Sequence, residues 1–333
     1  VMATQREELI GSPLPAISVI LPVLNEEAHL KSAINSILSQ DYKGQFEVIL
    51  ALGPSTDLTD SIAQDIAQID TRVVLARNPT GRTAVGLNIA LQKSQRPVIV
   101  RVDGHSQLPS SYLSLVVEIL NKTGAVNVGG VMAAVGTTAF EKAVAGAMRS
   151  SLGVGASKFH TGGEAGEADT VYLGAFRREA LLAIGGFDER FTRAQDWELN
   201  FRLRARGGII YFDPRLHVTY RPRPNVRALF KQYFEYGRWR RVVSRKHTGT
   251  INLRYLAPPA ALVGFSLSLL LGFLAPVLFI PAVIYLLFIL AASIKISTSF
   301  QEYFLLLAVL PTMHFAWGMG FISSSKTLVP SSE

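Results

Sequence analysis

Residues 1–102 alternate between short apolar runs and longer segments with the periodicity of amphipathic helices. The apolar runs are rich in β-branched residues and cover residues 16–24, 46–52, 72–77 and 97–102. The helical patterns between them cover Glu27–Ser39, Leu58–Ile69 and Thr83–Lys93. Strands that alternate with helices predict an α/β fold with a mostly parallel, doubly wound sheet. Ligands of such sheets bind outside the carboxyl ends of the strands, so the segments after the four runs are candidate sites.

The last third of the chain has a different pattern, in which apolar residues follow one another without an intervening charge. No Asp, Glu, Lys or Arg occurs in the 40 residues Tyr255–Ile294, and Pro276 lies near the middle of that run. Since a membrane-spanning helix needs about 20 apolar residues, we predict three spans, at about Leu256–Leu274, Val277–Ile294 and Tyr303–Ile322. Buried helices of a large soluble core are the alternative, but core helices rarely run so long without a charge.

The net charge of +8 is concentrated in one segment beside the apolar run. Residues 221–247 contain nine Lys and Arg and one Glu, so the rest of the chain is neutral overall. This distribution favours a membrane partner and no nucleic acid. The positive-inside rule places the first 250 residues in the cytoplasm and leaves the C-terminus outside after three spans. We therefore expect a multi-pass protein of the plasma or inner membrane, without a signal peptide because the first apolar stretch has only strand length.

The basic segment also has an amphipathic pattern. Between Asn225 and Val243, apolar residues recur with helical spacing at Val226, Leu229, Phe230, Tyr233, Phe234 and Gly237. The opposite face carries Arg227, Lys231, Arg238 and Arg241. Such a helix is expected to lie in the headgroup plane with its apolar face toward the bilayer, although a plain basic flank of the first span explains the charge equally well. The chain then divides into a catalytic domain (1–220), an interfacial segment (221–254) and a transmembrane region (255–325).

Three segments that follow strands have plain local explanations. Pro22, Asn25 and Glu26 lie at the end of the first strand, where Asn25 could cap the next helix. Asp57 is a similar candidate cap after the second strand. The third helix opens near Arg82, where backbone amides and the guanidinium could meet a phosphate. Each segment alone is a weak indication of function.

The fourth strand leads into Asp103-Gly104-His105. The side chains of Asp103 and His105 are two residues apart in an extended segment, so they point in the same direction. A carboxylate and an imidazole together suit Mn²⁺ or Mg²⁺, above all where phosphate oxygens complete the ligand set. A capped turn with a solvated histidine is the alternative. Since the chain has no cysteine, thiolate metal sites, disulfides and cysteine nucleophiles are excluded.

A later helical segment, Gln195–Arg204, places Asp196 and Glu198 in its first turn. Acids there stabilise a helix through its dipole, which is a sufficient local explanation. Before it, Gly153–Ala168 contains five glycines and is expected to be a flexible lid or acceptor loop, or else a disordered surface loop. His160 within this stretch has no assignable role.

Taken in order and spacing, these stretches resemble the inverting glycosyltransferases of family 2, which have the GT-A nucleotide-diphospho-sugar transferase fold. The resemblance covers about residues 16–247 and is strongest to the branch of membrane-anchored glucosyltransferases of succinoglycan biosynthesis. The segments that carry the resemblance to this branch are Val102–His105, Leu173–Arg178, Gln195–Arg202 and Gln232–Trp239. Each is weak alone, and together they are a specific signal.

The resemblance implies a role for particular residues. The nucleotide-sugar would be bound by Pro22, Asn25, Glu26, Asp57, Arg82 and Asp103. The metal would be held by Asp103 with His105, and Asp196 would be the catalytic base, with a contribution from Glu198 to be tested. Arg238 and Trp239 would contact the acceptor or the diphosphate. The chain departs from the family pattern at two places. Leu52 and Gly53 replace the paired acids that the family usually has after the second strand, and Gln195 replaces the acid before the base.

The implied activity is transfer of a hexose from a nucleotide-sugar, a UDP-linked one being expected, to a lipid-linked sugar or glycolipid, in the synthesis of a surface polysaccharide or envelope glycan. One general base and an in-line attack give inversion. A processive polysaccharide synthase is an alternative, although Gln232 and Arg238 are further apart than the processive pattern requires. A catalytically inactive scaffold that binds nucleotide or lipid is a second alternative, which the retention of both Asp103 and Asp196 disfavours.

Overall fold

The computed structural model describes residues 14–328. The chain forms two compact units that interleave along the sequence. The first consists of residues 14–130, 164–189 and 199–218, and the second of residues 131–163, 190–198 and 219–328. One border, between residues 218 and 219, lies next to the expected limit at 220, and no border lies near the expected limit at 254.

The main sheet has the strand order β3-β2-β1-β4-β7-β5-β8-β6. Its strands are β1 (Ile17–Val23), β2 (Phe46–Leu52), β3 (Val73–Arg77), β4 (Val98–Arg101), β5 (Asn127–Ala134), β6 (Gly166–Glu167), β7 (Tyr172–Arg177) and β8 (Ile210–Tyr220). The pairs among β1 to β4 are parallel, whereas β7 is antiparallel to both β4 and β5, and β6 is antiparallel to β8. The first four strands lie where the apolar runs predicted them, and the mostly parallel α/β class is confirmed.

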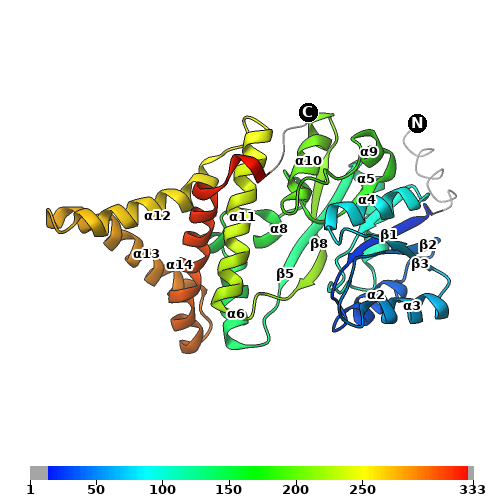
Figure 1. Cartoon of the computed structure of the whole chain (residues 1–333), viewed down its shortest axis with the longest axis horizontal. Coiled ribbons are helices and arrows are strands. Elements are labelled where there is room, and N and C mark those ends of the chain that lie inside the picture. The colour runs from blue at the N-terminus through cyan, green and yellow to red at the C-terminus, as the bar shows by residue number, and fades with distance from the viewer. Residues whose placement is uncertain (1–13, 329–333) are drawn as a thin grey trace, which may run out of the picture. The chain divides into compact units, whose positions relative to one another are not determined.

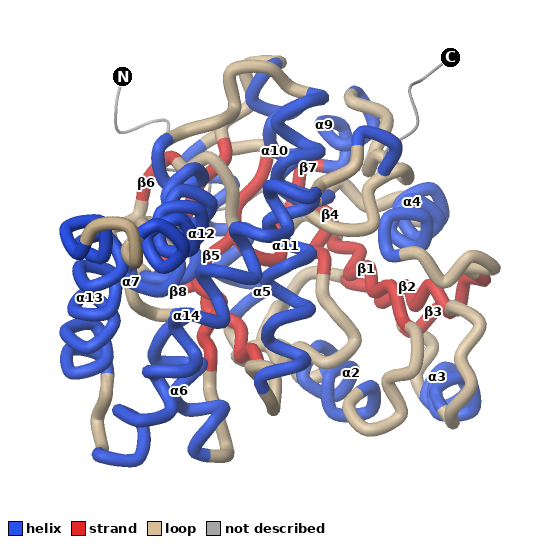
Figure 2. Tube along the Cα trace, turned by 60° about the vertical axis from the view of Figure 1, so that its left-hand side comes forward, coloured by secondary structure: helices blue, strands red, loops and turns tan. Residues whose placement is uncertain are grey.

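Helices cover both faces of the parallel strands. The bounds in the first unit are α2 (Leu30–Leu38), α3 (Thr59–Ile69), α4 (Thr83–Lys93), α5 (Tyr112–Thr123) and α9 (Arg178–Ala183). Figure 2 shows α2 and α3 on one side of β1 to β3 and α4 on the other. Because both faces are covered, β1 is buried at every position except Pro22, as expected of a central parallel strand. Helix α2 begins at Leu30 and not at Glu27, because residues 26–29 form a turn.

The second unit is mainly helical. Its elements are α6 (Ala139–Met148), α7 (Ser151–Val154), α8 (Lys158–Thr161), α11 (Val226–Lys246), α12 (Leu253–Leu271), the 3₁₀ turn Pro276–Phe279, α13 (Ile280–Ile296), α14 (Phe300–Ser323) and the 3₁₀ turn Lys326–Leu328. Helix α10 (Gln195–Ala205) crosses the border between the units. The glycine-rich stretch contains the end of α7 and all of α8, and Arg254 Nη1 donates to the Ala156 carbonyl at 2.9 Å, so part of this stretch is fixed to the start of α12.

Three helices are long and apolar enough to cross a membrane: Leu253–Leu271, Pro276–Ile296 and Phe300–Ser323. Each coincides with a predicted apolar segment within a few residues, so the expected helices are confirmed. Their surroundings differ, because 11%, 22% and 44% of the best apolar window is buried inside the protein, in that order. The third helix is thus much better covered by protein than the first two.

The amphipathic helix α11 packs against α14 through two glycines. A Cβ atom on Gly237 would stand 2.0 Å from the Trp317 carbonyl oxygen, and one on Gly320 would stand 1.9 Å from that of Phe234. Leu229 and Tyr233 on the apolar side of α11 are buried within the protein. Protein therefore covers part of the predicted apolar face, while Val226 and Phe230 on the same face are exposed.

Replacing Gly237 by Ala should lower the free energy of unfolding by about 1–3 kcal/mol, because one methyl group must separate two backbones in contact. Gly264→Ala in α12 is the matched control, since nothing lies within 4 Å of a Cβ there. It should be neutral or slightly stabilising, because Ala is the better helix former. Thermal unfolding of the detergent-solubilised variants compares the two, and equal midpoints would contradict the close packing of α11 on α14.

Candidate active site

The loops that follow β1 and β2 are joined by hydrogen bonds. Asn25 adopts a left-handed conformation with φ of 54°, and its Oδ1 accepts from the Thr56 backbone N–H at 2.8 Å. The Asn25 backbone N–H donates to Ser55 Oγ at 3.1 Å. Asn25 is well suited to this position because its short polar side chain tolerates the left-handed region. The residue predicted to line a nucleoside pocket thus also shapes the loops.

Asp57 belongs to the same loop junction. Its carboxylate accepts from the backbone N–H of Glu27 at 3.2 Å and from that of Thr59 at 3.0 Å. In return, Glu27 accepts from the Leu58 backbone N–H at 3.0 Å. Hydrogen bonds from Thr59 lower the pKa of Asp57 below its usual value. Asp57 therefore caps α3 and joins the two loops, which accounts for its presence without a ligand.

The same loops leave no room for an acid at residue 53. A Cβ atom on Gly53 would stand 3.0 Å from Leu24 Cδ1 and 3.1 Å from the Gly81 Cα. Pro22 lies just before this contact, in β1 opposite Ala51. The close approach of three loops explains in steric terms why glycine replaces the acid that the family pattern led us to expect.

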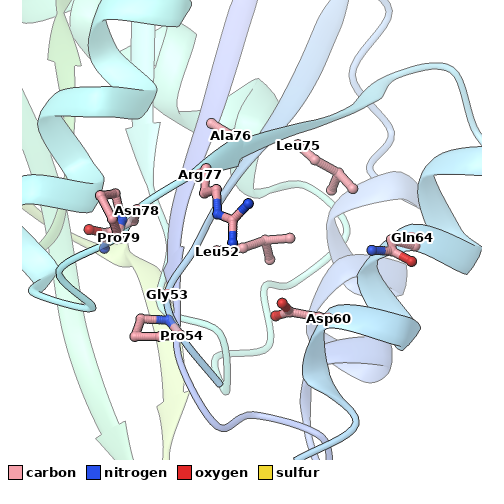
Figure 3. A pocket seen from close by; sticks show the side chains of 10 residues that line it. All are labelled: Leu52, Gly53, Pro54, Asp60, Gln64, Leu75, Ala76, Arg77, Asn78 and Pro79. Atoms are coloured by element: carbon pink, nitrogen blue, oxygen red, sulfur yellow. The ribbon is translucent and has the colours of Figure 1, made fainter. Parts of the chain in front are cut away.

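A pocket of about 510 Å³ opens at the carboxyl ends of β2 and β3. It is lined by Leu52, Gly53, Pro54, Asp60, Gln64, Leu75, Ala76, Arg77, Asn78 and Pro79. Figure 3 shows Asp60 and Gln64 on α3 across from Arg77 at the end of β3. None of the residues predicted for the nucleotide-sugar lines this pocket. The four-residue spacing of Asp60 and Gln64, which puts both on one face of a helix, is the signal that could have indicated it.

Glu26 and His105 meet across the sheet edge, although 79 residues separate them in the sequence. His105 Nδ1 donates to Glu26 Oε1 at 2.8 Å, and the Glu26 backbone N–H donates to Thr59 Oγ1 at 2.7 Å. The His105 side chain is 42% exposed and that of Glu26 is 19% exposed. A residue predicted for the nucleoside and one predicted for the metal are therefore in direct contact.

Asp103 follows β4 directly. Its Oδ1 accepts from Arg101 Nη2 at 3.0 Å, and 23% of its side chain is exposed. Arg101 is buried, so the ion pair holds the Asp103 carboxylate on its buried side, while part of the Asp103 side chain is exposed to solvent. Among residues 14–328, no three His, Asp or Glu side chains gather closely enough to hold a metal by themselves. Asp103 and His105 could bind a cation only if a ligand supplied further oxygens.

Arg82 contacts protein in this structure. Its Nη2 donates to the Glu189 carbonyl oxygen, while Asn88 Nδ2 donates to the Phe187 carbonyl at 2.8 Å and to Glu189 Oε1 at 2.9 Å. Arg82 and Asn88, at the start and in the middle of α4, thus hold the segment 187–189. The predicted phosphate contact of Arg82 remains a prediction.

Asp196 lies in the first turn of α10 and is half-buried. The residue before the helix, Ala194, has a φ of 58°, which costs energy for a residue with a Cβ atom. The Glu198 backbone N–H donates to the Ala194 carbonyl at 3.0 Å and closes the turn. Strained backbone of this kind occurs most often where a side chain must be held in one position.

Glu198, the second candidate acid, is fully buried. It accepts from Lys246 Nζ at 3.1 Å and from His247 Nε2 at 3.0 Å. Both partners come from the end of α11, 48 and 49 residues further along the chain. Removing one partner of such a buried pair is costly, and a buried carboxylate bonded to two basic groups is poorly suited to take a proton from a substrate.

Trp197, the residue directly after Asp196, is also held by α11. The guanidinium of Arg240 lies 3.6 Å from the centre of the Trp197 ring and 3.8 Å from that of Tyr255. Such stacking is worth about 2 kcal/mol when water is excluded. The two residues that follow Asp196 are therefore held in place by contacts with α11 and the residues next to it.

Trp239 and Arg238, the predicted acceptor contacts, differ in accessibility. Trp239 is buried, its ring centre lies 5.7 Å from that of Phe191, and its Nε1 donates to Glu235 Oε2 at 3.1 Å. Arg238 pairs with Glu235 Oε1 at 3.0 Å and keeps 31% of its side chain exposed. Trp239 is thus a packing residue in this structure, whereas Arg238 stays accessible to a ligand.

Comparison with known proteins gives a consistent picture. A model of glycosyl transferase family 2 matches residues 18–185. The chain is 32% identical over 307 residues to the succinoglycan biosynthesis protein ExoA of Rhizobium meliloti, covering 91% of this chain and 93% of that protein. It is 30% identical over 115 residues to a GalNAc(5)-diNAcBac-PP-undecaprenol beta-1,3-glucosyltransferase of Campylobacter jejuni, covering 33% and 36%.

Two solved structures share the fold. The mannosyltransferase PcManGT of Pyrobaculum calidifontis, in complex with GDP-Man and Mn²⁺, superposes with a TM-score of 0.59 at 17% identity, covering 96% of this chain and 92% of that one. Residues 1–349 of S. aureus TarS, in complex with UDP-GlcNAc, superpose with a TM-score of 0.52 at 15% identity, covering 90% and 89%. The fold is thus of the GT-A type, followed by three apolar helices that are candidates for membrane spans.

Proposed function

Because the chain belongs to glycosyl transferase family 2, we propose that it is a membrane-bound, inverting enzyme that transfers a hexose from a nucleotide-sugar to a lipid-linked sugar or glycolipid. The observation that carries the proposal is the cluster of loops at the carboxyl ends of β1, β2 and β4, where Glu26 and His105 are hydrogen-bonded and Asp103 follows the strand. Ligands of parallel sheets bind at this edge.

The donor would lie along these loops. Its nucleoside would occupy the ends of β1 to β3, where the pocket opens, and its diphosphate would approach Asp103. Carboxylate oxygens suit Mn²⁺ and Mg²⁺, so Asp103 and His105 would hold a divalent cation together with the phosphates of the donor. Bound there, the cation would neutralise charge on the leaving diphosphate. A solved neighbour with this fold contains GDP-Man and Mn²⁺.

Asp196 would act as the general base. Its carboxylate would accept the proton of an acceptor hydroxyl while the hydroxyl oxygen attacks the anomeric carbon of the sugar. The bond from that carbon to the phosphate oxygen breaks, and the nucleoside diphosphate leaves on the opposite face. Attack from one face and departure from the other invert the configuration. A positioned base contributes about 10²–10⁴-fold in rate, and the fixed neighbours Trp197 and Glu198 would hold Asp196 in place.

A lipid-linked acceptor is supported by two observations. The three apolar helices put the chain at a membrane, and relatives are named for acceptors on undecaprenyl diphosphate and on dolichyl phosphate. A relative that covers 91% of this chain is named for succinoglycan biosynthesis. The synthesis of a surface polysaccharide or envelope glycan is the process that these relatives suggest.

The proposal is tested by incubating the full chain, purified in detergent, with a panel of UDP- and GDP-linked hexoses. We expect one donor to be hydrolysed slowly with Mn²⁺ or Mg²⁺, to release a nucleoside diphosphate, and to be left intact when EDTA removes the metal. Undiminished hydrolysis in EDTA would contradict the proposed metal site but not the proposed transferase activity. Nucleotide binding without turnover of any donor, with or without membrane lipid, would instead support the inactive scaffold.

A further inference from the structure

The third apolar helix, α14, contacts polar parts of the second unit at three points along its length. At its start, Glu302 interacts electrostatically with Lys142 and Arg149 of the α6 region. In its middle, His314 Nε2 donates to the Leu152 carbonyl of α7 at 3.0 Å. Just past its end, Ser324 Oγ donates to the Arg238 carbonyl oxygen at 2.9 Å. A helix that crosses a bilayer alone would have such polar neighbours only near a membrane surface, and not along its whole length.

The neighbour of α14 along this length is α11. Figures 1 and 2 show the two helices side by side, and the close approach at Gly237 and Gly320 places them in contact. Near their ends, the guanidinium of Arg245 donates to the Ser324 and Ser325 carbonyls at 2.8 and 2.9 Å. Because the two helices pack side by side, α11 and α14 must lie at the same depth relative to a membrane.

Helix α11 is too highly charged to share the depth of a membrane span. Its 21 residues cover about 31 Å, close to the thickness of the hydrocarbon core. Exposed charges occur near both ends, at Arg227 and Arg245, and half-buried ones in between, at Glu235, Arg238 and Arg241. Each Arg or Lys at the centre of a bilayer costs about 2.5–3.5 kcal/mol even on the lowest scale. A vertical α11, and therefore a vertical α14, is excluded on energetic grounds.

Several apolar side chains of α14 are covered by protein, whereas Phe300, Phe304 and Ile322 are exposed. The buried ones are Leu306, Val309, Leu310, Met313, Ala316 and Phe321. Helices α12 and α13 differ, because their large apolar side chains are mostly exposed, among them Val263, Leu267, Leu270, Val283, Ile284 and Leu287. Figure 1 shows these two helices projecting away from α14 as a hairpin. Exposed apolar surface of this extent requires lipid or another apolar partner.

The turn of this hairpin is suited to an apolar environment. No polar side chain occurs between Ser268 and Tyr285. Where the turn interrupts the helices, Ser268 Oγ donates to the Leu278 carbonyl at 2.6 Å and accepts from the Ala282 backbone N–H at 3.1 Å. Backbone groups within lipid must be satisfied by the protein itself, and one buried serine satisfies two of them here.

We propose that, among residues 14–328, only the α12–α13 hairpin enters the bilayer, and that α14 lies on the same side of the membrane as α11 and the first unit. Lipid is the partner of the hairpin, whereas protein covers several apolar side chains of α14. Lys295 in the last turn of α13 and Lys326 after α14 would then both lie on the side of the basic segment, in agreement with the positive-inside rule. This replaces the expectation of three spans, which places the residues after α14 on the opposite side.

The absence of cysteine from the sequence makes the test direct. Lys43→Cys, at an exposed position of the first unit, and Lys326→Cys, at an exposed position after α14, are matched single-cysteine variants. Each full-length variant is treated with a membrane-impermeant maleimide in right-side-out and in inside-out vesicles, and labelling in detergent gives the total. We expect both cysteines to react in the same vesicle orientation and to be protected in the other.

Reaction of the two cysteines in opposite orientations would overturn the proposal and restore three spans. A protease-sensitive tag appended after residue 333 gives a second reading of sidedness without any substitution, and it should be cleaved in the same vesicles in which Lys43→Cys reacts. Both measurements compare one part of the chain with another, so they stay informative whatever the enzymatic activity proves to be.

Discussion

The Asp103→Asn variant should lose transfer activity by at least two to three orders of magnitude, on the order of 3–4 kcal/mol of transition-state stabilisation. Asn keeps an oxygen that can accept from Arg101, so the local fold should survive. The negative charge that would bind the cation is lost. Isothermal titration should therefore show weaker nucleotide binding in Mn²⁺ and unchanged binding in EDTA, a difference that a merely structural role would not produce.

The matched control is Asp65→Asn, at an exposed position of α3 outside the site, which should behave as the wild type. His105→Ala should have a milder effect than Asp103→Asn and should change the preference between Mn²⁺ and Mg²⁺, because an imidazole is a replaceable ligand for these ions. Undiminished activity of Asp103→Asn would remove the metal assignment, whatever the result at His105.

The Asp196→Asn variant should bind the donor normally and turn it over about 10²–10⁴ times more slowly, since only the proton acceptor is removed. The contrasting variant is Glu198→Gln. The Glu198 carboxylate is buried against Lys246 and His247. Loss of its charge in the variant should therefore lower the free energy of unfolding by about 1–2 kcal/mol. Below its melting temperature this variant should retain most of its turnover number.

Steady-state kinetics and thermal melts of these two variants separate catalysis from stability. The expected pattern is a slow, stable Asp196→Asn enzyme and a fast, less stable Glu198→Gln enzyme. The reverse pattern, with an inactive Glu198→Gln and an active Asp196→Asn, would show that the general base is Glu198.

The strands and helices of the first hundred residues could be predicted because their signals are local. Alternation of β-branched runs with amphipathic periods specifies both type and order, and β1 to β4 lie where the pattern put them. The start of α2 could not be predicted, because residues 26–29 are held in a turn by hydrogen bonds to the loop after β2. The sequence does not reveal which distant loop supplies such partners.

What covers the apolar and amphipathic helices could likewise not be predicted from sequence patterns. Hydropathy identifies α14 as apolar and α11 as amphipathic, but it cannot tell whether lipid or protein covers an apolar face. The close approaches of Gly237 to Trp317 and of Gly320 to Phe234 join residues 80 and 86 positions apart, and they show that protein covers this side of both helices. The same limit applies to Glu198, whose ion pair with Lys246 explains its burial better than a catalytic role does.

The candidate site was predicted in part. The resemblance drew attention to Glu26 and His105, and their contact across 79 residues brings the two predicted positions together. It gave no indication of the pocket with Asp60 and Arg77, because those residues lie outside the family's motifs. The roles of Asp103 and Asp196 stay predictions, since they concern a reaction and not a contact.

The most direct test of the central claim is transfer of a radiolabelled hexose from a nucleotide-sugar into the organic-extractable lipid of bacterial membranes, by the full chain in nanodiscs. The account predicts that label moves into lipid with release of one nucleoside diphosphate per sugar, that the new bond has inverted configuration, and that Asp196→Asn nearly abolishes both. Label that never enters lipid, with no nucleoside diphosphate released from any donor, would contradict it.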